Sequence, residues 1–147
     1  GQLTGGLDGG AGELTVSLLD GGTLDLTGIG AGGLRFDLGA DTTAGSSYDR
    51  ILLTAGTLAI DNLEFADFSF NPLAEFGVGT YKLFTTTGIS GGLGAVTSGV
   101  IGGYASSLQI TGNELELLVV PEPSTLFLVG LAGAGLLVLG LRRRLQN

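Results

Sequence analysis

The sequence contains no cysteine, histidine, methionine or tryptophan, and only three of its 147 residues are proline. Without cysteine the chain has no disulfide scaffold, no thiolate metal ligand and no thiol nucleophile. The lack of histidine removes the usual general base and the commonest zinc ligand, which excludes histidine-based catalytic triads and zinc sites. We therefore expect no cofactor, and we expect that the chain is not an enzyme.

Basic residues are also scarce. Residues 1–120 carry three of them against thirteen acidic residues, whereas residues 121–147 carry three arginines and one glutamate. Because nucleic-acid binding needs clustered lysine and arginine, the acidic body excludes nucleic acid as a partner. The chain starts at Gly1 and lacks methionine, so we expect either a processed chain or the C-terminal part of a longer protein.

Glycine is abundant, with 29 residues, but it follows no collagen-like period, and the hydrophobic content of 44% argues against disorder. Glycine pairs separate short runs rich in Leu, Thr and Val, a pattern typical of short strands joined by tight turns. The predicted breaks between strands are the glycine pairs at residues 9–10, 21–22, 32–33, 91–92 and 102–103. Because no sustained helical period occurs in residues 1–119, the sequence predicts an all-β domain there. The predicted strands are 14–18, 23–26, 34–38, 50–54, 57–60, 63–70, 80–85, 107–110 and 114–119.

Several of these runs alternate apolar and polar residues, as in residues 34–38, where Leu and Phe share one face and Arg and Asp share the other. A loose Gly-x-Leu-x-Leu pattern recurs at residues 12–16, 22–26 and 56–60. Such a degenerate repeat favours a parallel β-helix or a related stacked β-fold, in which each rung covers the next. A β-sandwich is the alternative. Since a single rung cannot bury its own apolar face, this domain is expected to be the end of a longer solenoid.

Residues 120–147 form a different kind of segment. Pro121 and Pro123 flank Glu122 and favour extended backbone. Residues 126–141 then carry no charge, and as a helix they would measure about 24 Å, which with residues 124–125 nearly spans a membrane. The three arginines that end this segment, and that the positive-inside rule places in the cytoplasm, are Arg142, Arg143 and Arg144. An ordinary buried helix and a permanent membrane anchor are the alternatives.

The Pro-Glu-Pro element, the apolar segment and the arginine cluster, in this order, resemble the PEP-CTERM sorting signal of Gram-negative bacteria. The resemblance implies recognition by an exosortase, a membrane-embedded cysteine transpeptidase that would cut near Pro121, Glu122 and Pro123. These residues then belong to a substrate and do no catalysis. Arg142, Arg143 and Arg144 would act as the cytoplasmic stop.

The body resembles, more loosely, the C-terminal part of proteins with autotransporter-associated β-strand repeats. The resemblance rests on residues 34–39, 49–53, 79–84 and 112–117. It implies a β-helical, surface-exposed domain.

A few charged residues are candidates for chemistry. Asp61, Glu64 and Asp67 lie three residues apart, a spacing that fits neither strand alternation nor a convincing pair of glycosidase carboxylates. They are expected to form a solvated face or turn. Lys82, the only lysine, is expected to be an outward-facing surface charge. For calcium, Asp41 and Asp49 are weak candidates, because the glycine-aspartate spacing of a calcium-binding β-roll is not kept. We therefore expect no metal site.

The sequence thus favours a non-enzymatic exported protein of the cell surface or extracellular matrix. It would be held briefly at the inner membrane with its body on the periplasmic side, and then sorted outward by an exosortase. Its acidic face, which also bears Thr and Ser, would contact extracellular polysaccharide or water. The alternatives are the C-terminal fragment of a surface carbohydrate-active enzyme or adhesin, and a permanently membrane-anchored protein.

Overall fold

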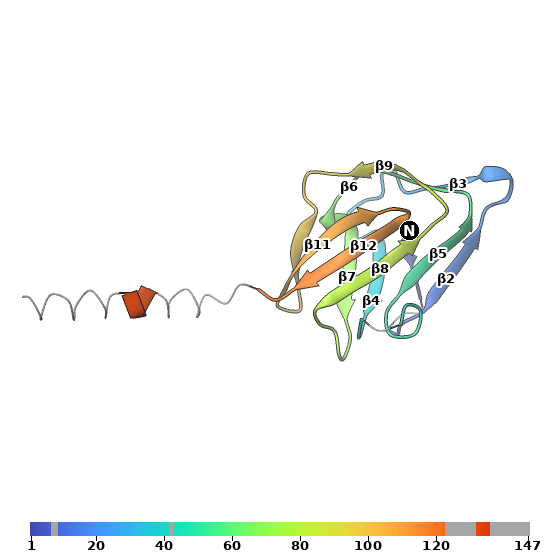
Figure 1. The fold of residues 1–147 in the computed structure, drawn as a ribbon. Coiled ribbons are helices and arrows are strands. Elements are labelled where there is room, and N and C mark those ends of the chain that lie inside the picture. Colours follow the sequence, from blue (N-terminus) through green and yellow to red (C-terminus); the bar gives the residue numbers. More distant parts are fainter. Residues whose placement is uncertain (7–8, 42, 123–131, 136–147) are drawn as a thin grey trace, which may run out of the picture.

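The computed structural model describes residues 1–6, 9–41, 43–122 and 132–135, and it confirms the all-β class. Short strands separated by tight turns make up most of the body (Figure 1). The elements are β1 (Leu3–Thr4), β2 (Glu13–Ser17), η1 (Leu19–Gly21), β3 (Thr23–Asp25), β4 (Leu34–Leu38), β5 (Arg50–Ala55), β6 (Thr57–Leu63), η2 (Phe65–Asp67), β7 (Phe68–Pro72), β8 (Gly79–Thr85), β9 (Ile89–Leu93), β10 (Ser98–Ile101), β11 (Tyr104–Thr111) and β12 (Glu114–Val120).

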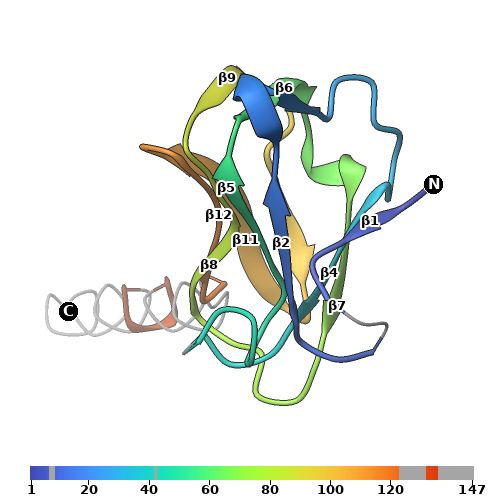
Figure 2. The same ribbon diagram turned by 90° about the vertical axis from the view of Figure 1, so that its right-hand side faces the viewer.

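The first nine strands form three parallel ladders. Each strand from β4 to β9 pairs with the strand three positions before it in the chain, which gives the ladders β1–β4–β7, β2–β5–β8 and β3–β6–β9. Apolar residues stack in register along them, as Leu34 does on Phe68, and Leu24 on Leu58. Figures 1 and 2 show the three sheets as three sides around a common interior. The parallel pairing contradicts the sandwich alternative, whose sheets are antiparallel.

The last three strands form an antiparallel meander that extends the second ladder. β12 lies between β8 and β11, and β10 is the outer strand of the resulting six-stranded sheet. The turn from β10 to β11 consists of Gly102 and Gly103, both with positive φ (56° and 86°). Two successive residues of this kind suit the tight hairpin turn that matches the twist of the strands. The predicted glycine break at this point is confirmed.

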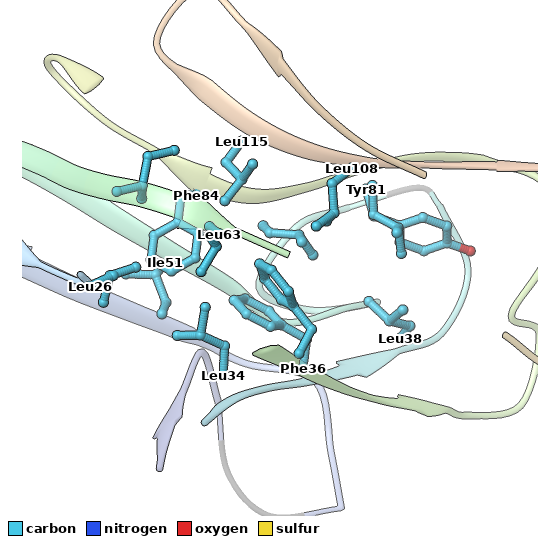
Figure 3. Close-up of a cluster of buried hydrophobic side chains, with 14 of the residues drawn as sticks. Leu26, Leu34, Phe36, Leu38, Ile51, Leu63, Tyr81, Phe84, Leu108 and Leu115 are labelled. Carbon is cyan, nitrogen blue, oxygen red and sulfur yellow. The ribbon is translucent and has the colours of Figure 1, made fainter. Parts of the chain in front are cut away.

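The core lies inside the three sheets and takes side chains from each of them (Figure 3). Phe36 of β4 meets Phe84 of β8 edge to face, with ring centroids 5.7 Å apart, and this contact joins two sheets across the interior. The fully buried side chains with the largest volumes are Tyr81, Phe36, Phe84, Leu34, Leu38, Ile51, Leu53, Leu58, Ile60, Leu63, Leu83 and Leu115.

Most predicted strands are confirmed to within a few residues, but two predictions are wrong. Residues 63–70 are not one strand, because η2 turns the chain between β6 and β7. Gly91 and Gly92 do not separate two strands, because both lie within β9. Gly91 has a φ of 88°, and a Cβ atom there would overlap the carbonyl oxygen of Ile60 in β6. Glycine at this position is therefore a requirement of close strand packing, not a turn signal.

One buried hydroxyl gives a prediction about stability. The Thr85 hydroxyl oxygen in β8 is buried and has no hydrogen-bond partner within the part of the chain that the structure describes. Valine has nearly the same shape without the polar atom, so we expect Thr85→Val to raise the free energy of unfolding by about 1 kcal/mol. Urea unfolding measures the change. Thr23→Val, at an exposed hydroxyl in β3, is the control, and an equal gain in both variants would contradict the explanation.

Candidate functional site

The segment predicted to direct sorting begins where the last strand ends. In β12, Val119 is fully buried and pairs with Gly79 of β8, and Val120 pairs with Ala105 of β11. Pro121 has no N–H to donate, so it cannot continue the ladder. Pro121 and Glu122 are exposed and follow the sheet with no spacer. The structure therefore places two of the three predicted motif residues at the surface.

The rest of the predicted signal lies largely outside the described residues. Pro123 and the arginines at 142–144 are not among them, and of the apolar segment at 126–141 only residues 132–135 are described; these four are helical and exposed. Within the described ranges, the structure contains no helix that is both long enough and apolar enough to cross a membrane. The predicted transmembrane helix therefore stays a prediction.

Asp49, one of the two weak metal candidates, is a buried carboxylate that accepts hydrogen bonds from two other segments of the chain. Its Oδ1 accepts a hydrogen bond from the backbone N–H of Gly12 at 2.7 Å, and its Oδ2 accepts one from the N–H of Asp37 at 2.9 Å. A side chain on Gly6 would overlap Oδ1, so the glycine leaves the space that the carboxylate fills. Burial is the main cause that raises the pKa of Asp49, although the two amide donors oppose it.

The alternation of residues 34–38 predicts which side chains face the core, but it does not predict that Asp37 on the other face is also buried. The predicted face is correct, because Leu34, Phe36 and Leu38 all point into the core. Asp37, on the opposite face, is nevertheless only 1% exposed. Its Oδ1 accepts a hydrogen bond from Nδ2 of Asn71, the residue that stacks on it in β7, at 2.8 Å. The adjacent ladder position thus supplies a partner that the local pattern does not reveal.

Asp41, the other metal candidate, also binds backbone. Its Oδ2 accepts a hydrogen bond from the N–H of Thr80 at 2.7 Å, at the start of β8. A side chain on Gly79 would overlap this carboxylate. Across the described residues, no group of three or more potential ligands (His, Cys, Asp or Glu) is arranged to hold a metal ion. Asp41 and Asp49 therefore bind backbone amides in this structure, and a glycine that is distant in the sequence leaves room for each carboxylate.

The carboxylates at 61–67 form the predicted turn. Asp67 Oδ2 accepts a hydrogen bond from the N–H of Glu64 at 2.8 Å, which closes η2. Glu64 Oε1 accepts one from the N–H of Ala95 at 3.2 Å. Asp61 is exposed on β6 and accepts a hydrogen bond from Asn62. These contacts confirm the expectation of a turn or solvated face.

The outer face of the six-stranded sheet carries the remaining polar cluster. Lys82 Nζ lies 2.8 Å from a carboxylate oxygen of Glu114, which confirms that this lysine is a surface charge. The hydrogen bond that Lys82 donates to Glu114 is the main cause that raises the pKa of Lys82. Next to this pair, Glu116 Oε2 accepts hydrogen bonds from Gln109 Nε2 and Thr111 Oγ1 at 2.9 and 2.8 Å. This arrangement is a hydrogen-bonded polar surface.

The comparisons with known proteins bear on the exposed segment after β12. A family model described as the PEP-CTERM protein-sorting motif matches residues 119–144. No curated protein matches the sequence, and no solved structure matches the fold. The comparisons give no support to the resemblance between the body and autotransporter-associated β-strand repeat proteins. Residues 119–144 of this chain are a PEP-CTERM protein-sorting motif, the kind of motif that an exosortase recognises on secreted or cell-surface proteins that pass through the membrane.

Proposed function

We propose that this chain is a non-enzymatic exported protein whose β-structured body an exosortase releases or transfers to the outside at the Pro-Glu-Pro element. The observation that carries the proposal is the position of the motif. It follows the last strand directly, and Pro121 and Glu122 are exposed, so an enzyme can reach them without unfolding the body. The inner membrane would hold the protein only until this processing, with the body on the periplasmic side.

The proposal includes a parallel β-helix as the architecture of the body. In support, β1–β3, β4–β6 and β7–β9 each supply one strand to each parallel ladder, as successive turns of a solenoid would. Backbone hydrogen bonds join the stacked segments at one corner, where the N–H of Thr57 donates to the carbonyl of Gly22 and the N–H of Leu58 to that of Gly88. Stacked turns give a rigid, extended surface, which suits a structural protein outside the cell.

A structural role is favoured over catalysis because the candidate carboxylates accept hydrogen bonds from the backbone. Asp41, Asp49, Glu64 and Asp67 all accept backbone hydrogen bonds that close turns or join strands. The outer face of the six-stranded sheet, with the partly exposed side chains of Lys82 and Glu114, offers a donor and an acceptor to hydrated partners such as an extracellular polysaccharide. This ligand class is part of the proposal.

The experiment that tests the proposal is mass spectrometry of the protein from its native host. We expect a mature exported form that ends near the Pro-Glu-Pro element. Replacing Pro121 and Pro123 together by alanine is expected to abolish this processing. Pro72→Ala, the only other proline of the chain, is the matched control and should leave it intact. A mature exported form of the unaltered protein that still ends at Asn147 would refute processing by an exosortase.

A further inference from the structure

Exposed apolar side chains cross the end of the six-stranded sheet from which the sorting motif leaves. The strand register aligns Val100 of β10 with Ala105 of β11, and Ala105 with Val120 of β12. Partners in antiparallel register point to the same side of a sheet. The neighbours Ile101 and Val119 are buried, so this side is the outer one. Val100 is 63% exposed and Val120 is 40% exposed.

The row continues onto the strand on the other side of β12. Val119 pairs with Gly79, so Val78, which precedes β8, lies at the level of Val120. Val78 is 54% exposed. A shallow hollow of about 390 Å³ lies along the same end of the sheet, and Val100 and Val120 line it together with small residues of β10 and β11. We call Val78, Val100, Ala105 and Val120 the valine row.

The sorting motif starts at the valine row. Pro121 is covalently joined to Val120, and an extended chain advances at most about 3.6 Å per residue, so Glu122 lies within about 7 Å of Val120. Any enzyme that encloses the Pro-Glu-Pro element must therefore also approach this end of the sheet. Figure 1 shows β12 ending at the side of the body where the start of β11 and the loop before β8 also lie.

We propose that the valine row is a second contact surface for the exosortase, which would place an apolar rim of its substrate cleft against it. Contact with such a rim would remove the exposed valines from water and hold the motif in register. The acidic composition of residues 1–120 argues against an anionic lipid surface as the occupant, because like charges repel each other. The proposal rests on the proposed function, since it assumes that an exosortase processes this chain.

The first test compares processing rates in the native host. The double variant Val78→Ser and Val100→Ser keeps the motif unchanged and replaces exposed side chains only. We expect processing to slow by about fivefold or more, because two half-exposed valines are withdrawn from the contact. The matched control is Leu19→Ser, at an apolar side chain that is 84% exposed in η1, outside the row. It should be processed at the unaltered rate.

The second test uses the absence of cysteine from the chain, which makes an introduced thiol unique. A photoreactive probe is attached to Val100→Cys, or to Leu19→Cys as control, and illuminated in membranes of the native host. We expect a crosslink to the exosortase from position 100 and none from position 19. Crosslinks from position 100 to lipid alone would overturn the proposal in favour of a membrane contact.

The outcomes separate this inference from the proposed function. If the unaltered chain is not processed, the proposed function fails, and the inference fails with it. If the unaltered chain and the double variant are processed at the same rate, the valine row is not a contact surface, although the proposed function stands. Equal melting temperatures of the double variant and the unaltered chain are required, so that slow processing cannot arise from an unfolded body.

Discussion

A chain that ends after Glu122 is expected to keep the full thermal stability of the body, whereas a chain that ends after Asn113 is expected not to fold. The two differ by β12, the strand that joins β8 to the rest of the meander. Pro121 and Glu122 are exposed and follow the last ladder pair, so the core does not need them. Thermal unfolding followed by circular dichroism measures both chains.

The expected loss follows from what β12 buries. Leu115, Leu117 and Val119 are all fully inaccessible to solvent. Burial of each side chain of this size is worth about 1.5–3 kcal/mol, so the three together approach the 5–15 kcal/mol by which a typical domain is stable. Removal of β12 also leaves an unpaired edge on both β8 and β11. We therefore expect the shorter chain to be unfolded at room temperature.

Single substitutions in β12 provide the matched control. Leu117→Ala is expected to lower the free energy of unfolding by about 2–5 kcal/mol, because it opens a cavity in the core. Leu118→Ala, one residue further on and on the outer face, is expected to cost much less. Similar losses at both positions would mean that strand pairing, not burial, sets the contribution of β12. A marked loss of stability in the chain that ends at Glu122 would mean that residues beyond 122 support the body.

Asp49→Ala is expected to lower the free energy of unfolding by about 3 kcal/mol. The substitution removes the acceptors of two backbone N–H groups, those of Gly12 and Asp37, and an unsatisfied buried donor costs about 1–3 kcal/mol. It also empties the space beside Gly6 that the carboxylate fills. Urea unfolding at neutral pH measures the change. Asp49→Asn, which keeps the shape and one acceptor oxygen, should cost less.

The pH dependence of the same variant tests the state of the carboxyl group. Burial raises the pKa of Asp49 above its ordinary 3.8, so the folded protein holds this proton more tightly than the unfolded chain. The stability from this difference is complete below pH 3.8 and is lost as the pH rises through the raised value. The advantage of the unaltered protein over Asp49→Ala should therefore be greatest below pH 3.8. An advantage that grows with pH would mean that the two amide donors outweigh burial.

Much of the fold could be predicted because the strands are short and alternate. The runs at residues 34–38, 80–85 and 114–119 each show their buried face locally, and β4, β8 and β12 lie there within a residue or so. Three strands were missed, and all of them are short or contain glycine. β10 has four residues, one of which is glycine. β1 has two residues, and β9 contains two glycines, so neither shows an apolar alternation. Their pairing with β4 and β6 comes from partners about thirty residues away along the chain.

The candidate site divides in the same way. The sequence by itself determined the sorting motif, because Pro121, Glu122 and Pro123 are recognised as a linear segment whose meaning does not depend on the fold. It also determined the all-β class, since a period of two is a local property of the chain. Only the tertiary structure decided which acidic residues are buried and which side chains meet beside the motif. Asp49 and the valine row owe their surroundings to parallel ladders and a meander, and such long-range pairings leave no local pattern in the sequence.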